Sequence, residues 1–127
     1  MKTFAAGFVA ASALLVASAG AQTSITVSLT NYAFTPGTLT LKAGETYRIH
    51  FSNDAGKGHD FTAREFFQSS TVAAADKGKL EDGEEVELDG GQSADITLTP
   101  NRPGTYPVTC THFMHSMMGM TGKIVVQ

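Results

Sequence analysis

The chain has 127 residues, 42% of them hydrophobic, with nine basic and twelve acidic side chains and a formal net charge of −3. This acidic balance argues against a nucleic-acid partner, because proteins bind phosphate backbones through clustered Lys and Arg. A single cysteine excludes an internal disulfide and also excludes a binuclear copper site of the oxidase type, which needs two thiolates.

The first 21 residues have the organisation of a secretory signal peptide. Lys2 supplies a short positive region, Phe4 to Val16 is apolar, and Ala19-Gly20-Ala21 fits a cleavage site. We therefore expect cleavage after Ala21 and a periplasmic or otherwise exported domain over residues 22–127. An uncleaved membrane anchor is the alternative, although the apolar run is short for a spanning helix. No later stretch reaches the roughly 20 apolar residues of a span, so we expect a soluble mature chain without stable membrane insertion.

The mature chain is dominated by alternation of apolar and polar residues, the pattern of strands with one buried face. This alternation occurs at Ile25–Leu29, Leu39–Leu41, Tyr47–Phe51, Val86–Leu88, Ala94–Leu98, Tyr106–Cys110 and Ile124–Val126. Turn residues such as Pro36-Gly37 and Gly90-Gly91 separate the runs. Seven to eight short strands at this spacing predict an all-β fold, a Greek-key β-sandwich.

Two segments depart from the alternating pattern. Thr62 to Ala75 resembles a short irregular helical insertion, in which Phe66 and Phe67 are expected to join the core. Acidic side chains crowd Glu81 to Asp89, which indicates either a solvated loop and strand edge or a docking patch for a basic partner. His50 alternates with apolar neighbours and should face the surface.

The stretch from Cys110 to Met120 carries the chemistry of the chain. It holds the only cysteine, two of the four histidines and four of the five methionines. Thiolate, imidazole and thioether form the ligand set of a soft or borderline metal ion. In an oxidising compartment a lone thiol is either buried and inert or coordinated to a metal.

A mononuclear copper site for electron transfer uses two imidazoles, one thiolate and a weak axial thioether. Cys110 ends an alternating strand, and His115 and Met120 follow it in one loop. The second imidazole must come from elsewhere, and His59 stands at an upstream junction between a loop and a strand. The pattern thus predicts a copper site assembled from two distant segments.

The residues alone leave two positions of this site open. His112 is an alternative to His115 as the loop imidazole. Met117 or Met118 can replace Met120 as the axial ligand if the loop folds differently.

The segment 103–126, Pro-Gly-Thr-Tyr-Pro-Val-Thr-Cys followed by His, Met-Gly-Met and Gly-Lys-Ile-Val-Val, resembles the copper-binding end of cupredoxins. His59-Asp60-Phe61 is similar to the upstream copper-binding segment of that family, and the spacing Cys-x4-His-x4-Met resembles the auracyanin type most. The resemblance implies one copper ion per chain, with His59, Cys110 and His115 as equatorial ligands and Met120 as the axial ligand.

The resemblance also implies roles for residues around the metal. Asp60 and Thr111 match positions whose side chains hydrogen-bond each other and stiffen the two ligand segments. Gly58 matches a position whose carbonyl approaches copper from the other side. Asp60 is a carboxylate where many relatives carry an amide, so their reduction potentials do not transfer to this chain.

The function that follows is a one-electron carrier, expected to be monomeric and not an enzyme, since no catalytic arrangement of carboxylates or of Ser, His and Asp stands out. Electrons would pass the edge of His115 to a redox partner protein. That partner would dock on a surface made apolar by Phe113, Met114, Met117 and Met118, and it would be basic if the acidic segment steers it.

A periplasmic copper sequestration or delivery protein is the alternative function. Met114, Met117, Met118 and His112 are soft or borderline ligands beyond the four that one copper site needs. Clustered thioethers prefer Cu(I), although methionine is also an adaptable apolar packing residue.

Overall fold

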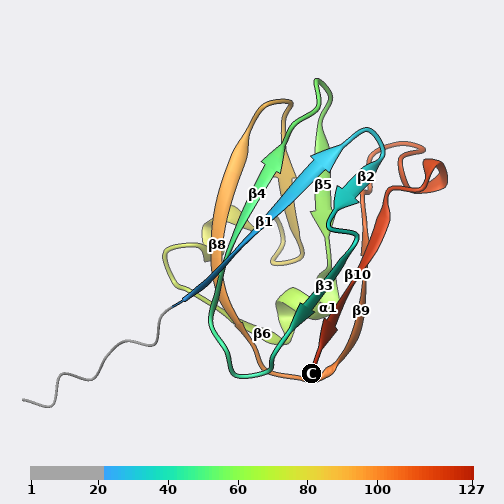
Figure 1. Ribbon diagram of the computed structural model, residues 1–127. Helices are drawn as coiled ribbons and strands as arrows, with labels where there is room; N and C mark the ends of the chain where they lie inside the picture. Colours follow the sequence, from blue (N-terminus) through green and yellow to red (C-terminus); the bar gives the residue numbers. More distant parts are fainter. Residues whose placement is uncertain (1–21) are drawn as a thin grey trace, which may run out of the picture.

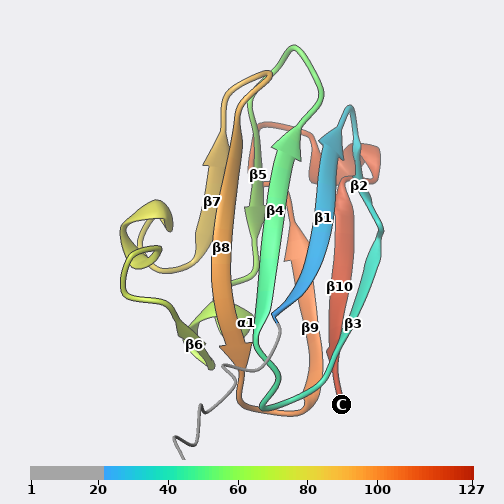
Figure 2. The same cartoon turned by 60° about the vertical axis from the view of Figure 1, so that its left-hand side comes forward.

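The computed structural model describes residues 22–127, and the predicted signal peptide lies outside this range. Two five-stranded sheets pack face to face (Figures 1 and 2). Their strand orders are β2-β1-β4-β8-β6 and β3-β10-β9-β5-β7. This arrangement confirms the predicted all-β Greek-key sandwich.

The first sheet contains β1 (Thr23–Thr30), β2 (Ala33–Thr35), β4 (Tyr47–Asn53), β6 (Ser70–Val72) and β8 (Ser93–Pro100). The second contains β3 (Thr38–Leu41), β5 (His59–Thr62), β7 (Glu85–Leu88), β9 (Gly104–Thr109) and β10 (Thr121–Val126). One α-helix, α1 (Arg64–Gln68), and two 3₁₀ turns, η1 (Lys77–Lys79) and η2 (Ser116–Met118), complete the described elements.

The described strands outnumber the seven to eight that the sequence pattern predicts, because two of them are very short. β2 and β6 have three residues each, too few for a period-two pattern to stand out. The predicted helical insertion is confirmed by α1, and it packs Phe66 and Phe67 into the core. His50 is half-exposed on the outer face of β4, as its alternation predicts.

Side chains from both sheets fill the space between the layers. On β4, Tyr47, Ile49 and Phe51 are buried while the intervening residues face outward. Each such side chain contributes about 1.5–3 kcal/mol when it leaves water. The largest fully buried side chains include Phe51, Phe66, Leu29, Leu41, Ile49, Ile96 and Leu98. This core holds the two sheets rigidly and therefore fixes the loops at their ends.

The register of three strands brings the two ligand-bearing segments together. β9 and β10 form a hairpin whose last pair, Thr109 with Thr121, closes the loop of residues 110–120. β5 runs antiparallel to β9 and pairs Thr62 with Thr109, so the residues before Thr62 lie opposite those after Thr109. The start of β5, which is His59, consequently lies at the same end of the sandwich as the 110–120 loop, and Figure 1 shows this end of β5 and the loop at the top of the molecule.

Within residues 22–127, no helix has both the length and the apolar character needed to cross a membrane.

Candidate metal centre

His59, Cys110 and His115 converge at the end of the sandwich beside the 110–120 loop. Sγ of Cys110 lies 3.8 Å from Nδ1 of His59 and 3.4 Å from Nδ1 of His115. The two imidazole Nδ1 atoms are 3.1 Å apart. Cys110 and His59 are buried, and His115 is half-buried. The structure thus brings together the thiol and both imidazoles that the sequence pattern singles out.

The triangle formed by these three ligand atoms has the size that a metal ion requires. A point equidistant from atoms 3.1, 3.4 and 3.8 Å apart lies about 2.0 Å from each of them. Metal–imidazole bonds are about 2.0–2.1 Å and metal–thiolate bonds about 2.3 Å. Two imidazoles and a thiolate in a trigonal set are the equatorial ligands of a blue-copper site, so the arrangement fits one type 1 copper ion per chain.

Asn31 orients the ring of His59. The Asn31 Oδ1 atom lies 2.8 Å from Nε2 of His59. An amide oxygen only accepts hydrogen bonds, so Nε2 carries the proton and Nδ1 keeps its lone pair for the cluster. Sequence reasoning missed Asn31, because it lies in the short β1–β2 turn and nothing in the local pattern links it to His59.

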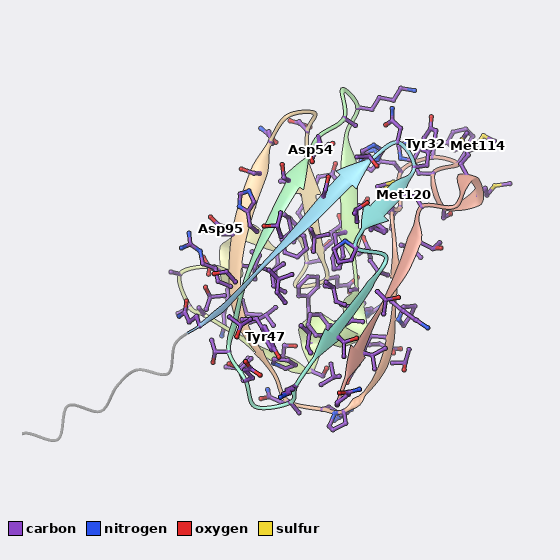
Figure 3. All side chains as sticks on the ribbon, in the orientation of Figure 1. Tyr32, Tyr47, Asp54, Asp95, Met114 and Met120 are labelled. Carbon is purple, nitrogen blue, oxygen red and sulfur yellow. The ribbon has the colours of Figure 1, made fainter. Side chains whose placement is uncertain are left out.

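Met120 is the fully buried thioether of the loop. Its backbone N–H donates to the carbonyl of His115 at 3.0 Å, and its own carbonyl accepts from the backbone N–H of Cys110 at 3.1 Å. Two hydrogen bonds therefore tie Met120 to two residues of the cluster. Figure 3 shows Met120 on the strand side of the loop and Met114 at its outer rim.

Asp60 connects the two ligand segments. Its Oδ1 accepts from the backbone N–H of Thr111 at 2.9 Å, and its Oδ2 accepts from the Thr111 hydroxyl at 2.5 Å. The hydrogen bond expected between these side chains is thus present. Because Asp60 follows His59 and Thr111 follows Cys110, the bonds fix the separation of the two ligand segments.

His112 lies beside the cluster and is directed away from it. Its Nε2 is 2.7 Å from Oε1 of Glu87, and its ring stacks on that of His115 with centroids 5.5 Å apart and planes 13° apart. Gly58 leaves space for this ring, since a Cβ at that position would lie 2.9 Å from Cε1 of His112. His115, and not His112, is the loop imidazole that joins His59 and Cys110.

Burial keeps the thiol and the inner imidazole neutral when no cation is bound. It lowers the pKa of His59 below the ordinary value of 6.5, an effect reinforced by His115 and His112. Burial also raises the pKa of the Cys110 thiol above its ordinary value of 9.0. A bound cation reverses this preference for the thiol, because a coordinating thiol is deprotonated.

The surface around His115 is apolar. Within residues 22–127, the exposed large hydrophobic side chains all belong to the loop: Phe113 (88% exposed), Met117 (80%), Met118 (56%) and Met114 (47%). We call these four residues the loop face. Tyr32, which no sequence pattern singles out, lies edge-on to His115 with ring centroids 5.1 Å apart. One ring of a buried cluster therefore borders an exposed apolar surface.

A Greek-key sandwich that gathers a thiol, two imidazoles and a buried methionine at one end of its strands defines a class of copper-binding β-sandwich domains. The chain belongs to the cupredoxin family, since the model of the cupredoxin-like domain matches residues 3–126. No curated protein matches the chain.

Solved structures share the fold at low sequence identity. Dithionite-reduced auracyanin from Roseiflexus castenholzii is 24% identical, with a TM-score of 0.62 over 85% of this chain and 99% of that chain. Auracyanin A, a "blue" copper protein from Chloroflexus aurantiacus, is 22% identical, with a TM-score of 0.61 over 84% and 100%. The multicopper oxidase mgLAC is 15% identical, with a TM-score of 0.65 over 84% of this chain but only 39% of that chain.

Proposed function

We propose that this protein is a one-electron carrier that holds one copper ion through His59, Cys110 and His115 as equatorial ligands and Met120 as the axial ligand. The observation that carries the proposal is the triangle of two Nδ1 atoms and one Sγ atom, whose centre lies about 2.0 Å from each. Copper, when bound, supplies the Cu(I)/Cu(II) couple. The residues around it supply a ligand set that the fold holds in place.

A fixed ligand set favours electron transfer, because little rearrangement then accompanies the change of oxidation state. Asn31 holds the His59 ring, Asp60 ties its segment to Thr111, and the Cys110 backbone is bonded to Met120. None of these hydrogen bonds has to form or break when an electron arrives. Catalysis is not part of the proposed role, which is that of a carrier alone.

We propose that the redox partner docks on the loop face, next to the half-buried ring of His115. Exposed apolar surface of this kind marks interaction sites, and transient redox complexes use small interfaces. The acidic segment from Glu81 to Asp89 includes β7, which runs alongside β5: Glu85 pairs with Thr62, and Glu87 pairs with Asp60, next to His59. We propose that this segment steers a basic partner toward the end of the sandwich that carries the cluster.

We further propose that the protein is exported after cleavage behind Ala21. The leader pattern supports this, and a single cysteine that is buried or coordinates a metal is compatible with an oxidising compartment. The mass of the mature protein isolated from its native compartment tests it, and retention of residues 1–21 would favour a membrane anchor.

Copper sequestration or delivery is the second candidate, favoured by the exposure of three thioethers on one loop. Copper stoichiometry separates the two functions. A carrier binds one ion per chain, whereas sequestration predicts additional Cu(I) that is lost when Met114, Met117 and Met118 are replaced together by leucine.

The visible and electron spin-resonance spectra of the copper-loaded protein test the main proposal. We expect an intense thiolate-to-copper charge-transfer band, a reversible potential, and loss of the band in Cys110→Ser. A Cys110→Ser protein that kept the band and full copper affinity would show the ligand assignment to be wrong.

A further inference from the structure

A second group of potential metal ligands lies next to the proposed copper site. Asp60 on β5, Glu87 on β7 and His112 in the loop place their ligand atoms within 4.8 Å of one another. Within residues 22–127, this group and the His59–Cys110–His115 cluster are the two places where three His, Cys, Asp or Glu side chains converge so closely. Nε2 of His112 lies 2.7 Å from Oε1 of Glu87 and 3.8 Å from Oδ2 of Asp60.

The charges in this group differ from those of an ordinary surface ion pair. On the outer face of the first sheet, His50 and Asp95 are 2.8 Å apart, and Arg48 supplies a second positive charge to Asp95. In the second group, two carboxylates face a single imidazole. Among the described residues, neither Asp60 nor Glu87 forms an ion pair with a lysine or arginine.

Burial makes this excess of negative charge costly. Asp60 is fully buried and Glu87 is partly buried. Burial raises the pKa of Glu87, and the nearby carboxylate of Asp60 adds to that effect. Asp60 accepts hydrogen bonds from Thr62 and Thr111, and among the described residues His112 is the one basic side chain that faces both carboxylates. Buried charges are normally paired or coordinate a metal, so a cation bound between Oδ2 of Asp60 and the carboxylate of Glu87 would balance the second negative charge.

The spacing of the ligand atoms suits a small divalent ion. Ligand atoms about 2.0–2.2 Å from a tetrahedral zinc ion lie roughly 3.3 Å from one another. The two distances from His112 Nε2, 2.7 and 3.8 Å, bracket that value. Gly58 contributes by leaving the space in which the His112 ring lies, since a Cβ there would be 2.9 Å from its Cε1.

We propose that Asp60, Glu87 and His112 bind one divalent cation of the borderline class, of which Zn²⁺ is the probe, at a site separate from the copper. The two sites are coupled, because His112 stacks on His115 and Asp60 bonds to Thr111, the neighbour of Cys110. A positive charge there disfavours Cu(II) relative to Cu(I). Zinc should therefore raise the potential of the copper, a consequence that rests on the proposed function.

The test uses the mature protein with Cu(II) already bound, so that zinc cannot occupy the first site. Zn²⁺ is titrated in competition with a zinc-binding dye while the blue band is monitored. We expect one Zn²⁺ per copper-loaded chain. Glu87→Gln and His112→Gln should each weaken zinc binding about tenfold or more. Removing an outer-shell partner of a metal ligand already costs about tenfold, and removing a direct ligand should cost at least as much. His50→Gln, the matched control, should leave zinc binding unchanged.

The proposal fails if the copper-loaded protein binds no zinc, if Glu87→Gln leaves zinc binding intact, or if His50→Gln weakens it equally. If His112→Gln also changes copper binding, the Glu87→Gln variant decides the outcome, because the side chain of Glu87 bonds to His112 and not to a copper ligand. A Cys110→Ala background separates the two proposals. Adding Glu87→Gln to that background should still weaken zinc binding, even if the chain forms no copper site.

Discussion

The side-chain oxygen of Asn31 lies 2.8 Å from Nε2 of His59 and thereby selects the tautomer of that imidazole. Asn31 belongs to the turn after β1, and His59 begins a strand of the opposite sheet. The contact bridges the two layers of the sandwich at the end that carries the cluster. It gives the ring a defined direction before any metal arrives.

Replacing Asn31 should weaken copper binding. Asn31→Leu removes the acceptor while keeping a similar volume, and we expect a loss of copper affinity of roughly 10–100-fold, measured by competition with a chelator. Asn31→Asp retains an acceptor oxygen and should keep most of the affinity. Asn101→Leu, at an exposed asparagine that bonds to Thr71, is the control. Unchanged affinity in Asn31→Leu would contradict the role of this contact.

Met120 should tune the site more than it holds the fold. Met120→Leu is close to volume-conserving and should cost less than about 1.5 kcal/mol of unfolding free energy. Copper should remain bound, with a raised reduction potential, because loss of a thioether donor disfavours Cu(II). The same change at exposed Met117 should leave the potential unaltered in cyclic voltammetry. A shift produced by Met117→Leu instead would assign the axial position to that residue.

Gly122 is required by a close backbone contact between β10 and the β2–β3 turn. A Cβ at this position would lie 2.7 Å from the carbonyl oxygen of Gly37, which is backbone and cannot rotate away. We expect Gly122→Ala to lower the free energy of unfolding by about 1–3 kcal/mol. Gly78→Ala has nothing within 4 Å of the new methyl group and should change stability by less than about 0.5 kcal/mol. Urea denaturation of both variants measures the difference.

Asp76 should make the fold sensitive to acid. Hydrogen bonds from Lys79 and from the backbone N–H of Thr97 lower the pKa of Asp76 below its ordinary value of 3.8. A lowered native pKa stabilises the fold above pH 3.8, and this contribution is lost as the pH falls through the native value. Asp76→Asn should therefore cost about 1–3 kcal/mol near neutral pH and much less in strong acid.

Denaturant unfolding of the metal-free protein at neutral pH and in strong acid measures how much Asp76→Asn lowers the free energy of unfolding under each condition. Asp89→Asn, at an exposed carboxylate, is the matched control and should change stability by less than about 0.5 kcal/mol. A cost for Asp76→Asn that is the same at both pH values would show that the change acts through packing and not through ionisation.

The loop face should control how quickly electrons leave the protein. Met117→Lys places a charge on an 80% exposed position of that face, and two copies of the variant repel each other when their loops meet. Electron self-exchange between oxidised and reduced protein, measured by nuclear magnetic resonance, should slow about tenfold or more, which is about 1.4 kcal/mol of barrier. The visible spectrum should stay unchanged.

Thr105→Lys supplies the control for Met117→Lys. It adds the same charge at an exposed position of β9, at the opposite end of that strand from Cys110. Equal slowing in both variants would indicate an effect of net charge and would contradict a role for the loop face.

The sequence predicts the sandwich because alternating residues such as Ile49 and Phe51 report directly which face is buried. It predicts the cluster because Cys110 and His115 stand in one short loop with a typical spacing. The partner of His59 could not be predicted, since Asn31 reaches it only through the packing of two sheets. The same holds for the Glu87–His112 contact, which needs β5 to pair with β7 on one side and with β9, the strand that leads into the 110–120 loop, on the other.

The division of the cluster between a single loop and a distant strand also affects how copper and folding are linked. Cys110, His115 and Met120 are near neighbours along the chain, so an unfolded chain can bind copper through them without forming the sandwich. A ligand that binds both states stabilises the native one only by the difference between the two affinities. The rise in melting temperature on adding copper should therefore report what His59 and the rigid scaffold contribute, and not the full strength of the copper site.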